Sequence, residues 1–535
     1  METMTTRRMN FLHIILTMCM LCRFVFAENI PEQFHISYGD DSSKMVVMWT
    51  TKKSSADGVL KYGRNLLNLD SETKYTNTHF EQHNTRGTQY YHRAKLLNLL
   101  EGRRYFYKVV DGNMTSQINS FNTLKNSDKE WVPKIMIYGD LGTYSPYMQS
   151  LVKLTETDEF STVIHNGDLA FNLHTDGGKR GDEFMNTIQP VAASVPYMTS
   201  PGDHEHFEDY VHYRMRFSMP DTDWPMPVEK LWYSFDVGLI HFISYSTEVY
   251  FDRHHRHNIQ LQKTWLIHDL ERANVSRVER PWIVAFGHRP MYCSNTDYPD
   301  CEKRDTILRA GLEDIFDKYG VDLVVQAHEH SYERTWPLYR GHVYERSYVA
   351  PKAPVHVING AAGNNEGLDT FKTKIAPWSA YQLGDDAYGS YGIMRAHNDS
   401  HLQWVQKSFS TNVTLDEFWI VQYQHGPFPK RLIPWFDTFG LELQTYIVVI
   451  AVCTIIVMSL GVCLLTKSCY RRGGTVPVET ERNTYEPLIA EGKVDDDNSD
   501  DDDLGDETSL FEKPRKHRLI EKNGLTFRDN GSYHY

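Results

Sequence analysis

The chain has 535 residues, of which 41% are hydrophobic and 13% aromatic, and this is enough for two or three domains with substantial cores. The formal net charge of −14 argues against nucleic acid as a partner, because proteins that bind phosphate backbones present basic surfaces. Nine acidic residues and no basic one lie between Val494 and Glu507, so much of this charge belongs to a C-terminal tail.

The first residues have the features of a signal peptide. Two arginines precede an apolar run from Phe11 to Phe26, and the small residues around Ala27 suit a signal peptidase. We expect cleavage after Ala27, which makes residues 1–27 the signal peptide. A signal anchor that stays attached is the alternative, but His13 and Arg23 interrupt the apolar run.

A second apolar segment lies near the C-terminus. No charged residue occurs between Glu442 and Lys467, and this length is close to the ~20 apolar residues that span a bilayer. The segment predicts a transmembrane helix over residues 444–466, and the basic residues after it place the disordered tail, residues 467–535, in the cytosol. We therefore expect a single-pass type I membrane protein of the secretory pathway. Its large N-terminal part would be luminal or extracellular, at the cell surface or in lysosomes or endosomes.

Cysteines and glycosylation motifs agree with this topology. Cys293 and Cys301 are the two cysteines of the expected ectodomain, and their spacing permits a disulfide in an oxidising compartment. Four sequons would be luminal and are expected to carry N-glycans, at Asn113, Asn274, Asn398 and Asn412.

Two folded domains are expected between the signal peptide and the membrane. Residues 28–125 contain short alternating runs separated by Gly, Asp and Asn turns, which predicts an all-β, fibronectin type III-like sandwich. This domain holds no cluster of ligands or nucleophiles, so its default role is packing or interaction. In residues 130–425, strands alternate with helices such as Asp305–Tyr319, which predicts an α/β domain completed by further strands after Trp336.

Five apolar runs of the second domain each end on groups that can bind a metal. Strands that end at one edge of a sheet bring their terminal side chains into one crevice. Any one of these residues alone is explained by a turn or by a hydrogen-bonded core histidine, but five successive endings are not. The carboxylates and imidazoles together suit Fe, Mn or Zn, and they are Asp140, Asp168, Asp203, His204, His288, His328 and His330.

A set of this kind can hold two metal ions. A carboxylate can bridge two cations, whereas each imidazole binds one, so one shared Asp with separate His and Asp groups on each side makes a two-metal site. Such a site binds a phosphate ester, activates a water, and stabilises the attacking and leaving oxygens.

With GD, GDLAF, GDHE, GHRP and AHEH in this order behind a β domain, the chain resembles the purple acid phosphatases of the calcineurin-like metallophosphoesterase superfamily. The flanking runs GHRPMYCS and HEHSYERTWP look like the animal, iron/zinc purple acid phosphatase-like branch. The resemblance covers Glu28 to Gln424 and implies a four-layer αββα catalytic domain after the sandwich.

The resemblance also implies a role for each candidate residue. It assigns Asp140 and His330 to the first metal, Asp168 to the bridge, and the remaining three ligands to the second metal: Asp203, His288 and His328. It makes His204 the catalytic residue that contacts the substrate phosphate or protonates the leaving group. The implied reaction is hydrolysis of phosphate monoesters at acidic pH, by attack of a metal-bound hydroxide and without a phosphoenzyme.

Three positions depart from the family pattern. Phe171 replaces the tyrosine whose phenolate binds iron(III), Asp203 replaces an asparagine, and Ala327 replaces a glycine. In the family pattern the ligands carry a total charge of about −3, and with the charge of the bridging carboxylate divided equally, about −2.5 belongs to the first site and about −0.5 to the second. In this chain the total is also about −3, but each site receives about −1.5. We therefore predict a colourless, divalent metal pair (Fe, Zn or Mn). Ala327 requires a backbone with negative φ at its position.

Two function classes follow. The first is a membrane-anchored acid phosphatase acting on a small-molecule or protein phosphate monoester. The alternative is a catalytically impaired pseudophosphatase whose ectodomain serves as a binding module. Retention of every candidate histidine and of both inner aspartates favours the enzyme, whereas loss of the phenolate favours the alternative.

Overall fold

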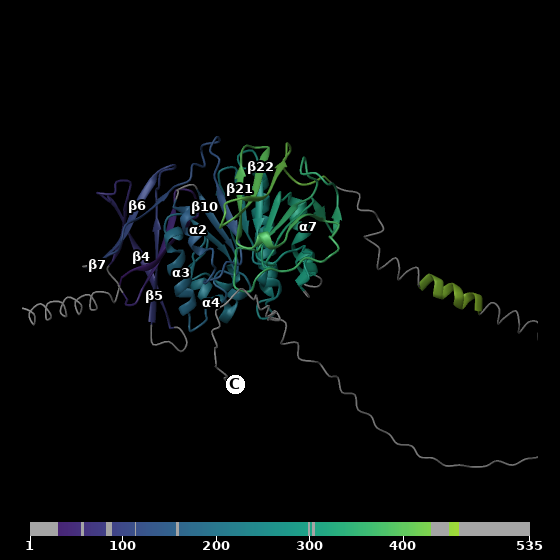
Figure 1. Ribbon diagram of the computed structural model, residues 1–535, viewed down its shortest axis with the longest axis horizontal. Coiled ribbons are helices and arrows are strands. Elements are labelled where there is room, and N and C mark those ends of the chain that lie inside the picture. The colour runs from purple at the N-terminus through teal and green to yellow at the C-terminus, as the bar shows by residue number, and fades with distance from the viewer. Residues whose placement is uncertain are drawn as a thin grey trace, which may run out of the picture. The chain divides into compact units, whose positions relative to one another are not determined.

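A computed structural model describes residues 30–54, 58–81, 88–112, 114–156, 160–297, 300–301, 305–429 and 449–459. The described residues fall into two units, one within residues 30–429 and one formed by residues 449–459 (Figure 1). The expected signal peptide, the expected tail and the sequon at Asn113 lie outside the described residues.

The first part of the chain forms the expected all-β domain. Its strands hydrogen-bond in the order β1-β2-β5-β4-β3-β6-β7, with β8 beside β6. The first residues of β4 pair with β3 and its later residues pair with β5, so this long strand joins two halves of the sheet. The strands are β1 (Glu32–Tyr38), β2 (Met45–Thr51), β3 (Val59–Gly63), β4 (Ser71–Glu81), β5 (Thr88–Leu96), β6 (Arg104–Asp111), β7 (Met114–Thr115) and β8 (Asn119–Asn122).

Aromatic side chains fill the space between the two halves. Phe34 of β1 stacks on Trp49 of β2 with ring centroids 6.0 Å apart, and it reaches Tyr107 of β6 at 6.2 Å. Contacts between strands from opposite ends of the sheet show that the two halves pack face to face. Burial of large aromatic rings is the main source of stability in such a core.

The second domain contains two mixed sheets. The first has the order β11-β10-β9-β21-β22-β23 and the second has the order β12-β13-β14-β15-β19-β16-β20. The strands of the first sheet are β9 (Ile135–Tyr138), β10 (Thr162–Asn166), β11 (Tyr197–Ser200), β21 (Ser390–Ala396), β22 (His401–Ser408) and β23 (Thr414–Val421). Those of the second are β12 (Tyr233–Val237), β13 (Ile240–Ser244), β14 (Trp282–Phe286), β15 (Leu323–Gln326), β16 (Tyr332–Thr335), β19 (Val355–Asn359) and β20 (Ser379–Leu383). A small hairpin pairs β17 (Leu338–Tyr339) with β18 (His342–Val343).

Helices cover the outer faces of both sheets. Alternate residues of a strand point to opposite faces, and β14 shows this directly: Trp282 and Val284 join the core between the sheets, whereas Ile283 and Ala285 join the outer cluster. Figure 1 shows α2 and α3 on one side of the strands and α7 on the other. The order of layers is therefore αββα. The helices are α2 (Met148–Thr155), α3 (Lys179–Ala192), α4 (Phe207–Arg216), α5 (His257–Val275), α6 (Asp305–Leu308) and α7 (Asp314–Tyr319), with a π-helical turn at Arg309–Glu313 joining the last two.

The parallel pairs of these sheets determine where the chemistry lies. Strand β10 runs parallel to β9 and to β11, and β13, β14, β15 and β19 run parallel to one another. Parallel neighbours end at the same edge of a sheet, and the segments that follow them therefore lie together.

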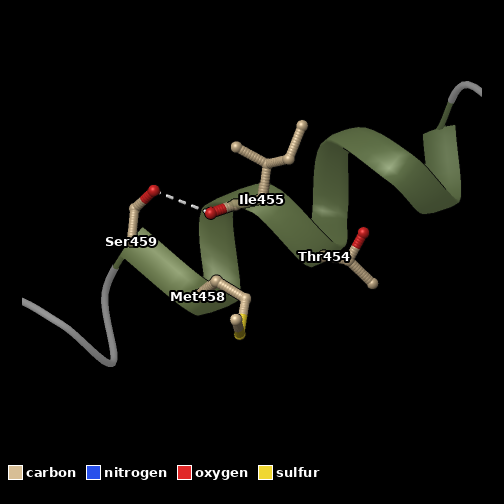
Figure 2. A pocket seen from close by; sticks show the side chains of 4 residues that line it. All are labelled: Thr454, Ile455, Met458 and Ser459. Carbon is tan, nitrogen blue, oxygen red and sulfur yellow. Dashed lines mark hydrogen bonds between the residues drawn. The ribbon is translucent and has the colours of Figure 1, made fainter.

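The described part of the second unit is one helix of residues 449–459. Figure 2 shows four of its side chains, with the Ser459 hydroxyl donating to the Ile455 carbonyl at 2.7 Å. Among the residues that the structure describes, no helix has the length and hydropathy needed to cross a membrane. The remainder of the predicted span, residues 444–448 and 460–466, lies outside the described residues.

Candidate metal centre

Every candidate ligand follows directly on a strand end. Asp140 comes two residues after β9, Asp168 two residues after β10, and His288 two residues after β14. Asp203 opens a short 3₁₀ turn, η2 (Asp203–Glu205), after β11, and His328 follows β15. The apolar runs thus end as strands that carry the candidate ligands, but the five strand ends come from two sheets and not from one edge of a single sheet.

The turns that carry these residues have unusual backbone conformations. Three of the candidate ligands have a left-handed backbone, a conformation that non-glycine residues rarely adopt. Their φ values are 59° for Asp140, 51° for Asp168 and 68° for His328. Gly167 makes the Asp168 turn possible, because its φ is 82° and a Cβ there would lie 2.4 Å from His288 Nδ1. Non-glycine residues held in this region are typical of functional sites, where the surrounding structure compensates for the strain.

Ala327 satisfies the backbone condition that the sequence sets. Ala327 is not among the described residues with positive φ, and the left-handed residue of the AHEH run is His328 instead. The methyl group of Ala327 packs against Gly139, and a Cβ added to Gly139 would lie 2.4 Å from this methyl carbon. The change from glycine to alanine therefore costs no backbone strain at this position.

Four side chains converge at the edge of the sheets. Asp168, Asp203, His288 and His328 each offer one ligand atom, and these atoms lie within 4.8 Å of one another. His288 Nε2 is 3.2 Å from Asp168 Oδ1 and 3.1 Å from Asp203 Oδ1, and His328 Nδ1 is 3.0 Å from the same Asp203 oxygen. Such a cluster of nitrogen and carboxylate oxygen ligands, all buried except the partly exposed Asp203, matches the preferences of a first-row transition metal.

Asp140 and His330 form a second pair beside this group. His330 Nε2 lies 3.5 Å from Asp140 Oδ1, and the backbone N–H of His328 donates to Asp140 Oδ2 at 2.9 Å. Asp140 is fully buried, and its Oδ1 accepts no hydrogen bond. A buried carboxylate oxygen without a donor is costly unless a cation is nearby, so the residues present fit a metal ion here as well.

Charge keeps the carboxylates of the site ionised. Burial by itself raises the pKa of Asp168 and of Asp203, but the facing histidines, together with Arg289 in the case of Asp203, outweigh it and hold both pKa values below the usual range. The pKa of His288 is raised, because the charges of the carboxylates outweigh the effect of burial. Two ionised carboxylates therefore face the candidate site at acidic pH.

His204 lies at the exposed side of the site. Its backbone N–H donates to Asp168 Oδ1 at 3.1 Å, its Nε2 is 3.7 Å from Asp168 Oδ2, and its Nδ1 is 3.0 Å from Asn172 Oδ1. Burial lowers the pKa of His204, but the charges of Asp168 and Asp203 outweigh this effect and raise it. A histidine with a raised pKa beside the site can hold a proton at acidic and near-neutral pH.

Phe171 occupies the position of the missing phenol. Its ring lies 4.6 Å from the His204 ring and 5.7 Å from the His330 ring. The side chain therefore lies between the candidate catalytic histidine and the candidate ligands of the first metal, where it offers packing but no ligand atom.

The structure also places supporting residues that the sequence left open or did not single out. Glu205 is buried, and its carboxylate accepts the backbone N–H groups of Asp168, Leu169 and Gly202. Asn166 donates from Nδ2 to the Gly287 and Val325 carbonyls at 2.9 and 3.1 Å. Its position directly before Gly167-Asp168 was the available signal, but its partners lie more than a hundred residues away.

Comparisons with known proteins agree with this geometry. The models of three families match the chain: the purple acid phosphatase N-terminal domain over residues 31–123, the calcineurin-like phosphoesterase over residues 133–332, and the iron/zinc purple acid phosphatase-like protein C over residues 353–417. Acid phosphatase type 7 of Mus musculus is 41% identical over 410 residues, covering 73% of this chain and 91% of the relative. The Homo sapiens protein of the same name is 41% identical over 414 residues, covering 74% and 92%.

A solved structure shows the same fold. The purple acid phosphatase PPD1 from seeds of yellow lupin, Lupinus luteus, aligns with a TM-score of 0.63 and 23% sequence identity, covering 74% of this chain and 75% of the lupin chain. At this identity the likeness concerns the fold alone. Together with the relatives of 41% identity, these matches show that the chain belongs to the purple acid phosphatase family and is a metal-dependent acid phosphatase acting on phosphate monoesters.

Proposed function

We propose that the chain is a membrane-anchored acid phosphatase with two divalent metal ions, held by the six candidate ligands in the roles that the resemblance implies. Asp140 and His330 would hold the first ion, Asp168 would bridge, and the second ion would be held by Asp203, His288 and His328. The observation that carries the proposal is the convergence of four of these side chains within 4.8 Å, with the other two beside them. When bound, the ions supply a binding site for the phosphate ester and a water activated for attack on phosphorus.

The protein's own residues prepare this chemistry. Glu205 fixes the Asp168 turn through three backbone N–H groups, so that the bridging carboxylate keeps one orientation. His204, beside Asp168 and partly exposed, is positioned to donate its proton to the oxygen of the leaving group. Phe171 places one apolar ring along one side of the site, in contact with the rings of His204 and His330.

The absence of a phenol supports a divalent pair. Phe171 has no oxygen to bind iron(III), and the carboxylate gained at Asp203 lies on the side of the second metal, next to His288 and His328. A trivalent ion in the first site would therefore meet about one negative charge fewer than the family pattern provides.

The test measures metal content and hydrolysis of an aryl phosphate from pH 4 to 8 on the purified full-length protein. We expect two equivalents of divalent metal, no visible absorption band, and activity that Asp168→Asn abolishes and His204→Ala reduces at least about 100-fold. His268→Ala, which removes an exposed histidine of α5, is the matched control and should behave as wild type. A chain without metal, whose rates equal those of Asp168→Asn, would instead support the pseudophosphatase alternative.

Membrane anchoring rests on the uncharged apolar stretch between Glu442 and Lys467. Expressed in cells, the full chain should stay in membranes after alkaline carbonate extraction, and a chain that ends after Pro434 should be secreted. Release of the full chain by carbonate would refute the anchor and leave the catalytic proposal unaffected.

A further inference from the structure

A disulfide-closed loop lies next to the candidate metal centre. Cys293 and Cys301 form the disulfide that the sequence predicts, with Cα atoms 5.1 Å apart, and both are buried. Cys293 follows the candidate ligand His288 by five residues, and Cys301 directly follows Asp300. The covalent bond therefore connects the strand end that carries His288 to the position of Asp300.

Asp300 is a buried carboxylate directed at the candidate ligand His328. Its side chain is 4% exposed, its Oδ2 lies 3.4 Å from His328 Nε2, and its Oδ1 lies 3.4 Å from Arg289 Nη1. Arg289 is itself buried, and its Nε is 3.1 Å from both carboxylate oxygens of Glu248. The charge of Asp300 is thus balanced by a guanidinium that a second carboxylate holds in place.

The two ring nitrogens of His328 face opposite surroundings. Nδ1 points into the candidate centre, 3.0 Å from Asp203 Oδ1 and 3.2 Å from His288 Nε2. Nε2 points away from it, toward Asp300 and toward Arg289 Nη1 at 2.8 Å. For Nδ1 to bind a metal, its lone pair must be free, and the single N–H of the neutral ring must then be on Nε2.

An N–H on Nε2 needs an acceptor, and Asp300 provides it. A guanidinium has only donors, so Arg289 cannot accept this hydrogen bond, whereas the Asp300 carboxylate can. Metal-binding histidines usually donate their second N–H to a carboxylate or carbonyl, which fixes the tautomer and the ring orientation. With this tautomer, Nε2 no longer accepts from Arg289 Nη1, which lies 2.8 Å away, and Arg289 Nη1 donates instead to Asp300 Oδ1, its other partner at 3.4 Å.

We propose that Asp300 is a positioning residue, held by the Cys293–Cys301 disulfide, that orients His328 for the second metal and makes retention of this metal depend on the disulfide. This inference rests on the proposed function, because it takes His328 as a ligand. It adds a residue that the strand-end pattern does not single out, and it gives the disulfide a role in metal binding.

The test compares the full-length wild type with Asp300→Ala, Asp300→Asn and the double variant Cys293→Ser, Cys301→Ser. Zn²⁺ affinity is measured by competition with a chromogenic chelator, and the melting temperature of the zinc-free chain reports folding. Asp269→Asn is the matched control, because Asp269 is also a buried carboxylate that faces a histidine, His241, through Oδ2 at 2.9 Å.

We expect wild type to bind two equivalents of Zn²⁺, and Asp300→Ala to bind the weaker equivalent about 10–100-fold less tightly. Asp300→Asn, which keeps an acceptor oxygen, should lose less, the cysteine variant should resemble Asp300→Ala, and Asp269→Asn should match wild type in Zn²⁺ affinity. Where Asp300→Ala lowers the melting temperature of the zinc-free chain, the comparison rests on Asp300→Asn and on reduction of the wild-type disulfide.

Unchanged affinity in Asp300→Ala and Asp300→Asn, with two equivalents still bound by wild type, would overturn this inference and leave the proposed function standing. A loss in the Asp300 variants without a loss in the cysteine variant would overturn the role of the disulfide. A wild-type chain that binds no Zn²⁺ would overturn the proposed function together with the inference.

Discussion

A histidine remote from the metal centre should make the stability of the catalytic domain depend on pH. His241 of β13 is 2.7 Å from Asp236 Oδ1 through Nδ1 and 2.9 Å from Asp269 Oδ2 through Nε2. Asp236 belongs to β12 and Asp269 to α5, so the imidazole joins the edge of the second sheet to the helix that covers it. Because both ring nitrogens face carboxylates, both must carry hydrogen, and the ring is favoured as an imidazolium.

The magnitude follows from the shift in pKa. Burial alone would lower the pKa of His241, but the hydrogen bonds and charges of Asp236 and Asp269 outweigh it and raise the pKa from 6.5 to about 9. A folded-state pKa above the unfolded value stabilises the folded state fully below about pH 6.5, and this stabilisation is lost as the pH rises through 9. With the side chain only 14% exposed, the shift corresponds to roughly 3 kcal/mol.

The measurement is the free energy of unfolding in urea, from pH 6 to pH 9.5, for wild type and for His241→Asn. Between these limits wild type should lose about 3 kcal/mol more than the variant, because the variant lacks the titrating ring. The metal centre is the same in both proteins, so its own pH dependence cancels in the difference. His268→Asn, which removes an exposed histidine of α5, the helix that carries Asp269, is the control and should follow wild type. Equal pH slopes for wild type and His241→Asn would refute the reasoning.

Three further predictions follow from single contacts. Glu205→Gln places amide hydrogens against backbone donors and should cost about 1–3 kcal/mol, seen as a lower melting temperature; an unchanged melting temperature would contradict the role given to this carboxylate. The sequon alone predicts a glycan at Asn274, but in the structure its amide donates to the Leu270 and Tyr319 carbonyls, so we now expect this site to be unmodified and the exposed Asn398 to carry a glycan; glycopeptide mass spectrometry decides, and a fully occupied Asn274 would refute the revised expectation. Phe171→Tyr adds a phenol next to the His330 ring, so the iron-loaded variant should gain a visible absorption band that wild type lacks, whereas a coloured wild type would disprove the divalent pair.

Much of the fold follows from patterns that are local in the sequence. Short alternating runs predict the first domain, and apolar runs that end on Gly-Asp or Gly-His place Asp168 and His288 at strand ends, where the structure has them. The strands of the last part of the chain are also evident from local alternation. Their sheets are not, because β19 joins the second sheet while β21 and β22 join the first. That choice depends on pairings between distant segments, which a single sequence does not contain.

The supporting residues of the centre were missed for the same reason. Asn166 looks like an ordinary residue before a turn, and its role appears only when β14 and β15 end beside it. Arg289 looks like the polar neighbour of a candidate ligand, and Asp300 like one more carboxylate of a polar loop. In the sequence, both residues lie 39 positions or fewer from His328. The contacts form only because the disulfide-closed loop packs against the strand end that carries His288.

Arg289 also changes the charge argument made from the sequence. Counting ligands alone gives the second site about −1.5, because Asp203 replaces a neutral amide. In the structure, Arg289 Nη2 lies 3.2 Å from Asp203 Oδ1, but the same guanidinium also faces Glu248 and Asp300, so it offsets only part of the added negative charge. The first site gains no negative charge, because Phe171, next to His330, stands where the family pattern has a phenolate. The first site then keeps less negative charge than the family pattern provides for a trivalent ion, and the proposed divalent pair rests on this arrangement of charges as well as on their number.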